Sequence, residues 1–183
     1  MLYRKTVTLK DGTSCLIKNP EPDEAAEVVR SFITTHGETE FLSSYPDEAP
    51  LTEESERKFI ESRNADERAI ELCAYIDGVI VATAGFSPVG RYEKLRHRAE
   101  YGVSVERAYW GRGIGRALTD ACIQCAVSAG FTQLELEAVA DNKSAISLYE
   151  SAGFVEYGRN PKGFKPRSGG WQEIVLMAKD LTE

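Results

Sequence analysis

The stretch YWGRGIGRAL, Tyr109–Leu118, carries three glycines at alternate positions directly before an apolar helical pattern. Glycine is a poor helix former and raises the entropic cost of folding, so this spacing calls for a functional reason. Ala99–Val105 before the stretch alternates like a β-strand, and Ile114–Ala129 after it repeats apolar residues at helical spacing. A helix N-terminus behind a glycine-rich turn binds anions, because its unpaired amides and its dipole both attract negative charge. The pattern therefore predicts a phosphate-binding loop.

Two familiar phosphate-binding motifs fit this loop poorly. A dinucleotide-binding fold requires G-x-G-x-x-G and an acidic residue about 20 residues later. Gly111 and Gly113 match, and Glu135 or Glu137 would supply the acid, but the third glycine position holds Arg116. A nucleotide-triphosphate P-loop requires Gly-Lys-Ser or Gly-Lys-Thr, and neither occurs in the chain. A dinucleotide-binding protein is therefore an unfavoured alternative, and the P-loop is excluded.

A second pattern lies downstream and completes a family resemblance. The segments VSVERAYWGRGIGRAL, Val103–Leu118, and LELEAVADNKSAISLYESAGF, Leu134–Phe154, together resemble the GNAT superfamily of N-acetyltransferases. That family has a strand, a [QR]-x-x-G-x-[GA] loop, a helix, another strand and the motif N-x-x-A-x-x-L-Y-x-x-x-G-F. The chain departs from the loop pattern at its first position, where Trp110 removes one expected polar contact. Every fixed position of the second motif is matched, by Asn142, Ala145, Leu148, Tyr149, Gly153 and Phe154.

The resemblance implies the fold class. We expect an α/β (α+β) GNAT fold over residues 1–183 as one domain, with a mixed, mostly antiparallel sheet of six or seven strands and helices on both faces. Asp-Gly pairs at Asp11-Gly12 and Asp77-Gly78 mark hairpins, in agreement with this order. The strands expected outside the motifs are Tyr3–Leu9, Cys15–Lys18, Ile70–Ile76, Val79–Phe86, Phe154–Tyr157 and Trp171–Met177, and the helices are Asp23–Gly37 and Thr52–Asn64.

Two segments show no regular pattern and are expected to be loops. Glu38–Leu51 contains two prolines and no sustained period, and Gly158–Gly170 is rich in glycine, proline and lysine. We predict that the second segment is a long mobile connection between the last two strands.

By the same resemblance, the bound molecule is acetyl-CoA as co-substrate, and no metal is required. Its pyrophosphate is expected to lie on the backbone amides of the loop, where the helix N-terminus supplies partial positive charge. The two arginines of the loop either add charge-assisted phosphate contacts or lie in solvent. The loop residues implied as cofactor-binding are Gly111, Arg112, Gly113, Ile114, Gly115 and Arg116.

The resemblance also implies where the pantetheine arm of CoA lies. In the family this arm pairs with the backbone of the preceding strand, here at Val103, Ser104 and Val105. That pairing requires the strand to separate from its neighbour, and Gly102 is consistent with a β-bulge that would separate them. Asn142 resembles the family asparagine that bonds the arm, with Ala145 beside it, although an N-cap of the following helix explains Asn142 equally well.

Two residues are implied in the chemistry. Tyr149 would protonate the CoA thiolate after an amine attacks the thioester. The reference pKa is ~10 for a tyrosine phenol and ~8.5 for a thiol, so this proton transfer is uphill by about 1.5 pKa units. The alternative for Tyr149 is a core aromatic. Glu100, three residues before Val103, is the implied general base for the amine, and a solvent-facing glutamate fits its position equally well.

The expected reaction is direct transfer of acetyl from acetyl-CoA to a primary amine in a ternary complex. The acceptor, a small-molecule or peptide amine, is expected to be chosen by the first helices and by the loops Glu38–Leu51 and Pro88–Arg98. The acidic segment YPDEAPLTEESE, residues 45–56, could attract a cationic acceptor, but we favour the interpretation that it is an ordinary solvated acidic loop. A non-catalytic CoA-binding or sensor domain is the alternative, since it would keep the glycine loop and lack an acceptor site.

Composition narrows the partners and the location. Twenty-two Lys and Arg against 29 Asp and Glu give a net charge of −7, which disfavours nucleic acid and anionic membranes as partners. No segment has the apolar length of a signal peptide core or a spanning helix, so we expect a cytoplasmic protein. Cys122 and Cys125 fit small residues of a helix core better than metal ligands. Whether the chain forms a homodimer is left open.

Overall fold

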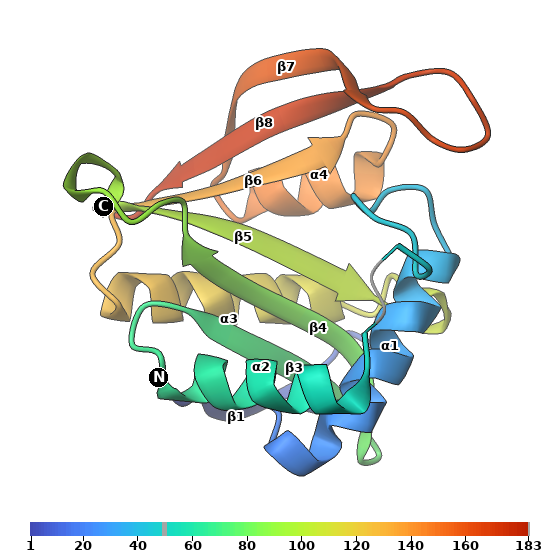
Figure 1. Ribbon diagram of the computed structural model, residues 1–183, viewed down its shortest axis with the longest axis vertical. Coiled ribbons are helices and arrows are strands. Elements are labelled where there is room, and N and C mark those ends of the chain that lie inside the picture. The colour runs from blue at the N-terminus through green and yellow to red at the C-terminus, as the bar shows by residue number, and fades with distance from the viewer. Residues whose placement is uncertain (49–50, 183) are drawn as a thin grey trace.

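The computed structural model describes residues 1–48 and 51–182. Its centre is a sheet of eight strands in the order β1-β2-β3-β4-β5-β6-β8-β7 (Figure 1). Neighbouring strands are antiparallel except β5 and β6, which are parallel. The mixed, mostly antiparallel sheet is therefore confirmed, but the count of six or seven strands was too low, because the hairpins at both chain ends join the same sheet. The strands are β1 (Arg4–Thr8), β2 (Ser14–Lys18), β3 (Ile70–Ile76), β4 (Val79–Pro88), β5 (Arg98–Val105), β6 (Gln133–Val139), β7 (Val155–Phe164) and β8 (Gln172–Asp180).

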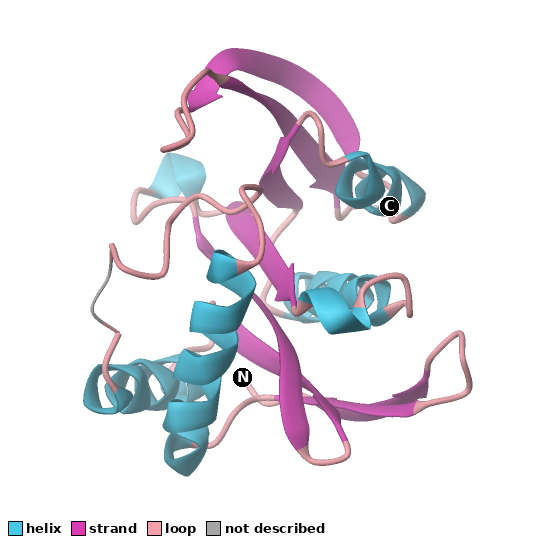
Figure 2. Cartoon of the chain, turned by 90° about the vertical axis from the view of Figure 1, so that its right-hand side faces the viewer, coloured by secondary structure: helices cyan, strands magenta, loops and turns pink. Residues whose placement is uncertain are grey.

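Helices cover both faces of the sheet, as predicted (Figure 2). They are α1 (Ala25–Gly37), α2 (Glu53–Ala65), α3 (Ile114–Ser128) and α4 (Lys143–Ser151), with short 3-10 turns at Pro22–Glu24, Glu93–Leu95 and Arg107–Tyr109. The side chain of Thr52 caps α2 by accepting from the Ser55 amide at 3.1 Å, which fixes where this polar helix begins.

Strand β3 shows how the sequence assigns the two faces. Its residues alternate, so Leu72 packs with the α3 residues of the larger core, whereas Cys73 packs with Ile60 of α2 and Val28 of α1. Both cores contain fully buried aliphatic side chains. Glu71 belongs to the second set and therefore lies on the α1/α2 face.

The tight turn between β3 and β4 follows its sequence directly. Asp77 and Gly78 have φ values of 51° and 81°, the left-handed backbone that an Asp-Gly hairpin turn requires. The hairpin predicted here is confirmed, and it sets the register that places Glu71 opposite Gly85.

Strands β5 and β6 diverge soon after they begin. They pair over Arg98–Glu100 with Gln133–Glu135 and then fan apart towards the right of Figure 1. The separation predicted for this strand is therefore present, but the predicted bulge at Gly102 is not, because β4 and β5 pair in unbroken register past this residue. Parallel strands joined by the long β5–α3–β6 crossover can part without any bulge.

The C-terminal segment corrects a second prediction. Strand β7 runs to Phe164, so the first half of the segment expected to be a mobile connection is β-structure. β7 lies at the sheet edge, where Pro161 breaks no ladder, and its register with β8 shifts between Asn160 and Phe164. A Cβ atom on Gly163 would lie 2.1 Å from the Ile174 side chain, so close approach requires this glycine.

The loop predicted for Glu38–Leu51 contains no helix or strand over residues 38–48, and its residues 49–50 lie outside the described part. Across residues 1–48 and 51–182, no helix combines the length and apolar character needed to cross a membrane.

Candidate active site

The glycine loop enters α3 through two left-handed residues. Gly111 has a φ of +75° and Gly113, the N-cap of α3, has a φ of +97°, a conformation that side-chain-bearing residues rarely adopt. Gly115 serves a different purpose, since a Cβ atom there would lie 3.2 Å from the Leu148 side chain of α4. The glycines thus shape the loop and also bring α3 close to α4.

The loop amides are available to a ligand. None of the backbone amides from Gly111 to Arg116 donates to another described residue, and the first bond of α3 runs from the Ala117 amide to the Gly113 carbonyl at 3.0 Å. The Lys10 amide donates to the Arg112 carbonyl at 3.2 Å, which ties the loop to the first hairpin. A row of unpaired amides at the start of a long helix is an anion-binding site.

Both loop arginines have partners within the protein. Arg112 donates to Asp11 at 2.6 Å and to the Thr13 hydroxyl at 2.7 Å. The hydrogen bonds from Thr13, together with Arg112, lower the pKa of Asp11 to about 2. Arg116 donates to Asp120 at 2.9 Å and to Ser151 of α4. A phosphate contact would require either arginine to leave these partners, so that part of the prediction stays open.

Trp110 has a structural reason to stand where the family pattern has a polar residue. Its indole nitrogen donates to the Val105 carbonyl at 2.7 Å, which closes the end of β5. The guanidinium of Arg107 lies 5.8 Å from the indole ring centre. The Val105 carbonyl is therefore occupied. The backbone of Val103 also faces away from β4 and is left as the strand edge for a ligand, whereas the backbone of Ser104 faces β4.

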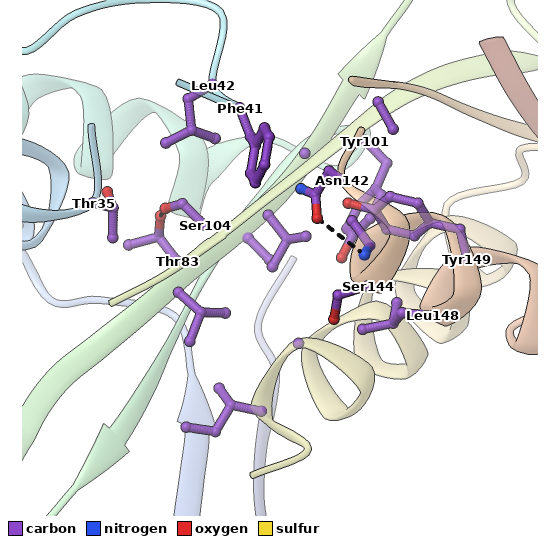
Figure 3. Close-up of a pocket in the computed structure, with 18 of the residues that line it drawn as sticks. Thr35, Phe41, Leu42, Thr83, Tyr101, Ser104, Asn142, Ser144, Leu148 and Tyr149 are labelled. Carbon is purple, nitrogen blue, oxygen red and sulfur yellow. Dashed lines mark hydrogen bonds between the residues drawn. The ribbon is translucent and has the colours of Figure 1, made fainter. Parts of the chain in front are cut away.

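A cavity of about 1010 Å³ passes through the sheet where β5 and β6 part. Residues from both faces line it, which requires an opening between the strands. In Figure 3, Thr35, Phe41 and Leu42 lie on one side of β5, whereas Asn142 and Tyr149 of α4 lie on the other. A ligand entering past α3 and a ligand entering past α1 would meet inside this cavity.

The residues predicted to bind CoA line this cavity for the most part. Those brought together are Val103, Ser104, Val105, Gly111, Gly113, Ile114, Gly115, Arg116, Asn142, Ala145 and Tyr149, whereas Arg112 is directed to Asp11. Asn142 caps α4, because its side-chain oxygen accepts from the Ala145 amide at 3.2 Å, as the dashed line in Figure 3 shows. Its capping role is thus present, and the carboxamide nitrogen is left for a ligand.

Tyr149 is both a core aromatic and a cavity residue. It is 8% exposed and packs edge-on against Tyr101 and Phe154, with ring centres 6.4 and 5.9 Å away. Burial raises the pKa of Tyr149 to about 12, so the phenol is protonated throughout the ordinary pH range. The hydroxyl of Tyr101 pairs with that of Thr119 at 2.9 Å, so of these two neighbouring phenols Tyr149 is the one available for chemistry.

The opposite side of the cavity carries carboxylates. Glu100 lines it from β5 and is exposed to solvent, at the last residue pair that joins β5 to β6. Glu71 of β3 also lines it, and the sequence did not single this residue out. Burial, followed by the charge of Glu56 and partly offset by Arg63, raises the pKa of Glu71 to about 8. An isolated glutamate at an inward-facing strand position was the signal that could have identified it.

The acceptor-side loops are partly as expected. Thr35 and His36 of α1 and Phe41 and Leu42 of the following loop line the cavity, in agreement with the prediction for the first helix and for Glu38–Leu51. Among the described residues that line the cavity, none comes from Pro88–Arg98, so the prediction that this loop selects the acceptor has no support from the geometry. Cys122 and Cys125 are buried in α3, as expected for core residues.

Comparison with known proteins decides the family. A family model described as the acetyltransferase (GNAT) family matches residues 34–154, from the last turns of α1 to the residue before β7. The chain belongs to this family. The resemblance inferred from the glycine loop and the Asn142–Phe154 motif is thereby confirmed.

Solved GNAT structures share the fold over nearly the whole chain. An acetyltransferase of the GNAT family from Streptococcus pneumoniae has a TM-score of 0.86 and 28% identity, covering 91% of this chain and 99% of that one. The yncA protein of Salmonella typhimurium, solved with its cofactor acetyl-CoA, has a TM-score of 0.82 and 21% identity, covering 92% and 95%. At that identity the second similarity shows the fold alone.

Curated relatives include an enzyme that is named for its substrate class. The L-amino acid N-acyltransferase MnaT of Escherichia coli strain K12 is 27% identical over 107 residues, which cover 58% of this chain and 62% of MnaT. Across three curated relatives the chain spans between 26% and 62% of their length.

Proposed function

We propose that the protein transfers the acetyl group of acetyl-CoA to a primary amine by direct attack in a ternary complex. The observation that carries the proposal is the row of unpaired amides from Gly111 to Arg116, which opens into a cavity that crosses the sheet. Such an arrangement holds a phosphate-bearing donor on one face and leaves the other face for an acceptor. Membership of the GNAT family supports acetyl-CoA as the donor.

On the donor side, the pyrophosphate and the pantetheine arm of CoA each have a counterpart in the chain. The amides of the loop bind the pyrophosphate. The backbone of Val103, on the edge of β5 that faces away from β4, pairs with the pantetheine arm, and Ser104 lies beside it. Asn142 offers its carboxamide nitrogen to the arm while its oxygen caps α4. These contacts bring the thioester to the point where the two strands part.

Tyr149 acts on the leaving sulfur. Because the pKa of Tyr149 is raised to about 12, complete proton transfer to the thiolate is uphill by about 3.5 units, more than reference values imply. The phenol therefore contributes as a hydrogen-bond donor to the negative charge that develops on sulfur, and the thiolate takes its final proton from solvent.

The acceptor approaches from the α1/α2 face. Glu100, the general base expected from the sequence, lies on this face, and Phe41 and Leu42 give the entrance an apolar wall. The relative MnaT is named for L-amino acids, so amino acids are included with polyamines and N-terminal peptides as acceptor classes. We also propose that residues 1–183 form one catalytic domain.

An acceptor screen tests the proposed function. Acetyl-CoA is incubated with the protein and with L-amino acids, spermidine or an alanine-terminated peptide, while free thiol is followed and the product is weighed by mass spectrometry. We expect thiol release that depends on an amine and a product heavier by one acetyl group. Tight binding of acetyl-CoA without transfer to any class would instead support the CoA-binding sensor.

A further inference from the structure

Glu71 turns its carboxyl group onto the neighbouring strand. Glu71 of β3 is paired with Gly85 of β4, and its Oε2 atom lies 2.9 Å from the point where a Cβ atom on Gly85 would be. Any side chain at position 85 would occupy that space. The lack of a side chain at Gly85, where a Cβ atom would also clash with the Ile70 backbone carbonyl, leaves room for the carboxyl group to lie over β4.

A second glycine continues the same row. Gly85 is paired with Gly102 of β5, and a Cβ atom on Gly102 would meet nothing within 4 Å. We call the surface over Gly85 and Gly102 the glycine strip. Because adjacent strands are about 4.8 Å apart, the Glu71 carboxyl group is roughly one strand spacing from the open space over Gly102.

The glycine strip leads to the reacting atoms. It has Ser87 and Glu100 on one side and Thr83 and Ser104 on the other, and all four side chains line the cavity. The hydroxyls of Thr83 and Ser104 lie 3.2 Å apart and form a polar wall. Gly102 stands just past the point where β5 leaves β6, which is where the proposed donor arm presents its thioester.

We infer that the amine of the acceptor lies over the glycine strip and that Glu71 takes its proton, directly or through one water. The inference rests on the proposed function and names the residue that acts on the acceptor. The nitrogen forms its bond to the acetyl carbon as the carbon–sulfur bond breaks. The Glu71 carboxylate takes one proton of the acceptor ammonium before the attack. The second proton that the nitrogen loses passes to solvent after the attack, and the electron pair of the broken carbon–sulfur bond leaves on sulfur.

The surroundings of Glu71 suit it to this role. Burial raises the pKa of Glu71 to about 8, the charge of Glu56 adds to the rise, and Arg63 opposes it. A lysine-like ammonium has a pKa of ~10.4, so the pKa difference for proton transfer to Glu71 is about 2 units. For transfer to a glutamate of ordinary pKa the difference is about 6 units. Cys73 lies beside Glu71 on the same face, and burial holds it as a thiol by raising its pKa.

Other titratable side chains also line the cavity, among them Lys10, Glu137, His36 and Glu100. His36 of α1 is half-buried, and burial lowers its pKa, so it is neutral at pH 7. Glu100 of β5 is exposed, whereas the Glu71 side chain is partly buried. The raised pKa makes the Glu71 carboxylate a stronger proton acceptor than a glutamate of ordinary pKa.

A charged CoA derivative tests the inference without knowledge of the natural acceptor. S-(2-aminoethyl)-CoA places an ammonium close to the attacking nitrogen, and S-propyl-CoA is its neutral match. We expect the wild-type protein at about pH 8.5 to bind the aminoethyl compound about tenfold more tightly in calorimetry, because Glu71 is then ionised. Glu71→Gln should lose this preference and keep its affinity for S-propyl-CoA. Glu61→Gln, which removes an exposed carboxylate of α2, should keep the preference.

A second variant tests the glycine strip itself. Gly102→Val adds a β-branched residue to a strand where a Cβ atom has free space, so the variant should fold. It should bind S-propyl-CoA like wild type and lose the preference for the aminoethyl compound.

Three results would overturn the inference. The first is a wild-type protein that binds S-(2-aminoethyl)-CoA no more tightly than S-propyl-CoA. The second is a Glu71→Gln variant that still prefers the aminoethyl compound. The third is a preference for the aminoethyl compound that is lost in Glu100→Gln and kept in Glu71→Gln. If neither CoA compound binds the folded protein, the proposed function itself is wrong and the inference falls with it.

Discussion

The Oε2 atom of Glu71 lies 2.9 Å from the position that a Cβ atom on Gly85 would occupy. Ionisation of Glu71 lowers the free energy of unfolding, because its pKa is raised to about 8 in the folded chain and returns to about 4.3 on unfolding. An acid whose pKa rises on folding stabilises the protein fully below the unfolded pKa, and that contribution is lost as the pH rises through the folded pKa.

Glu71→Gln should therefore stabilise the protein increasingly with pH. Relative to wild type, its free energy of unfolding should gain on the order of 4 kcal/mol between about pH 4 and about pH 9, since the glutamine never ionises. Urea denaturation at the two pH values measures this. An equal difference between the two proteins at both pH values would show that Glu71 ionises normally.

The rate of transfer should follow the same titration. As a base, Glu71 must be ionised, so kcat/KM should rise with pH and level off above an apparent pKa near 8. Deprotonation of the acceptor amine also raises the rate with pH, so the comparison with Glu71→Gln is the decisive one. In Glu71→Gln the rise of kcat/KM near pH 8 should be absent. If the rise remains in this variant, it reports deprotonation of the acceptor amine and not of Glu71.

Tyr149→Phe should separate catalysis from binding. Removing the phenol deletes the hydrogen bond to the developing thiolate, so kcat should fall by about 100-fold while the Kd for acetyl-CoA changes little. Tyr92→Phe is the matched control, because Tyr92 is 66% exposed and lies away from the cavity. An unchanged kcat in Tyr149→Phe would remove this residue from the mechanism.

Gly113→Val should distort the anion site. A β-branched residue at a φ of +97° costs about 1–3 kcal/mol, and the loop amides should turn away from the ligand. Gly130→Val is the control, since Gly130 has a φ of +80° at the far end of α3 and carries similar strain. Both variants should lose similar stability, and only Gly113→Val should lose tenfold or more in acetyl-CoA affinity. Equal affinities in the two variants would place the phosphate elsewhere.

The fold could be predicted where local chemistry determines it. The Asp77-Gly78 pair favours the left-handed backbone of a tight turn, so the hairpin between β3 and β4 could be predicted. The Asn142–Phe154 motif likewise predicted the N-cap and the buried tyrosine of α4. The β7 strand could not be predicted, because Pro161 and Gly163 signal a loop unless the strand is known to lie at an edge against Ile174.

The donor side of the site could also be predicted, whereas the acceptor side could not. The donor loop is contiguous in sequence, so spacing alone predicts its amides and helix. Glu71, Gly85 and Gly102 come from three strands and meet only through sheet register. Their spacing in the sequence does not predict that these three residues lie in one row, because the row depends on the register between β3, β4 and β5.

The central claim is that the cleft beside α3 binds acetyl-CoA, and isothermal titration calorimetry of the wild-type protein tests it most directly. We predict saturable binding of one acetyl-CoA per chain and no binding of NAD under the same conditions. Folded protein that gives no heat with acetyl-CoA, or that binds NAD in its place, would contradict the account.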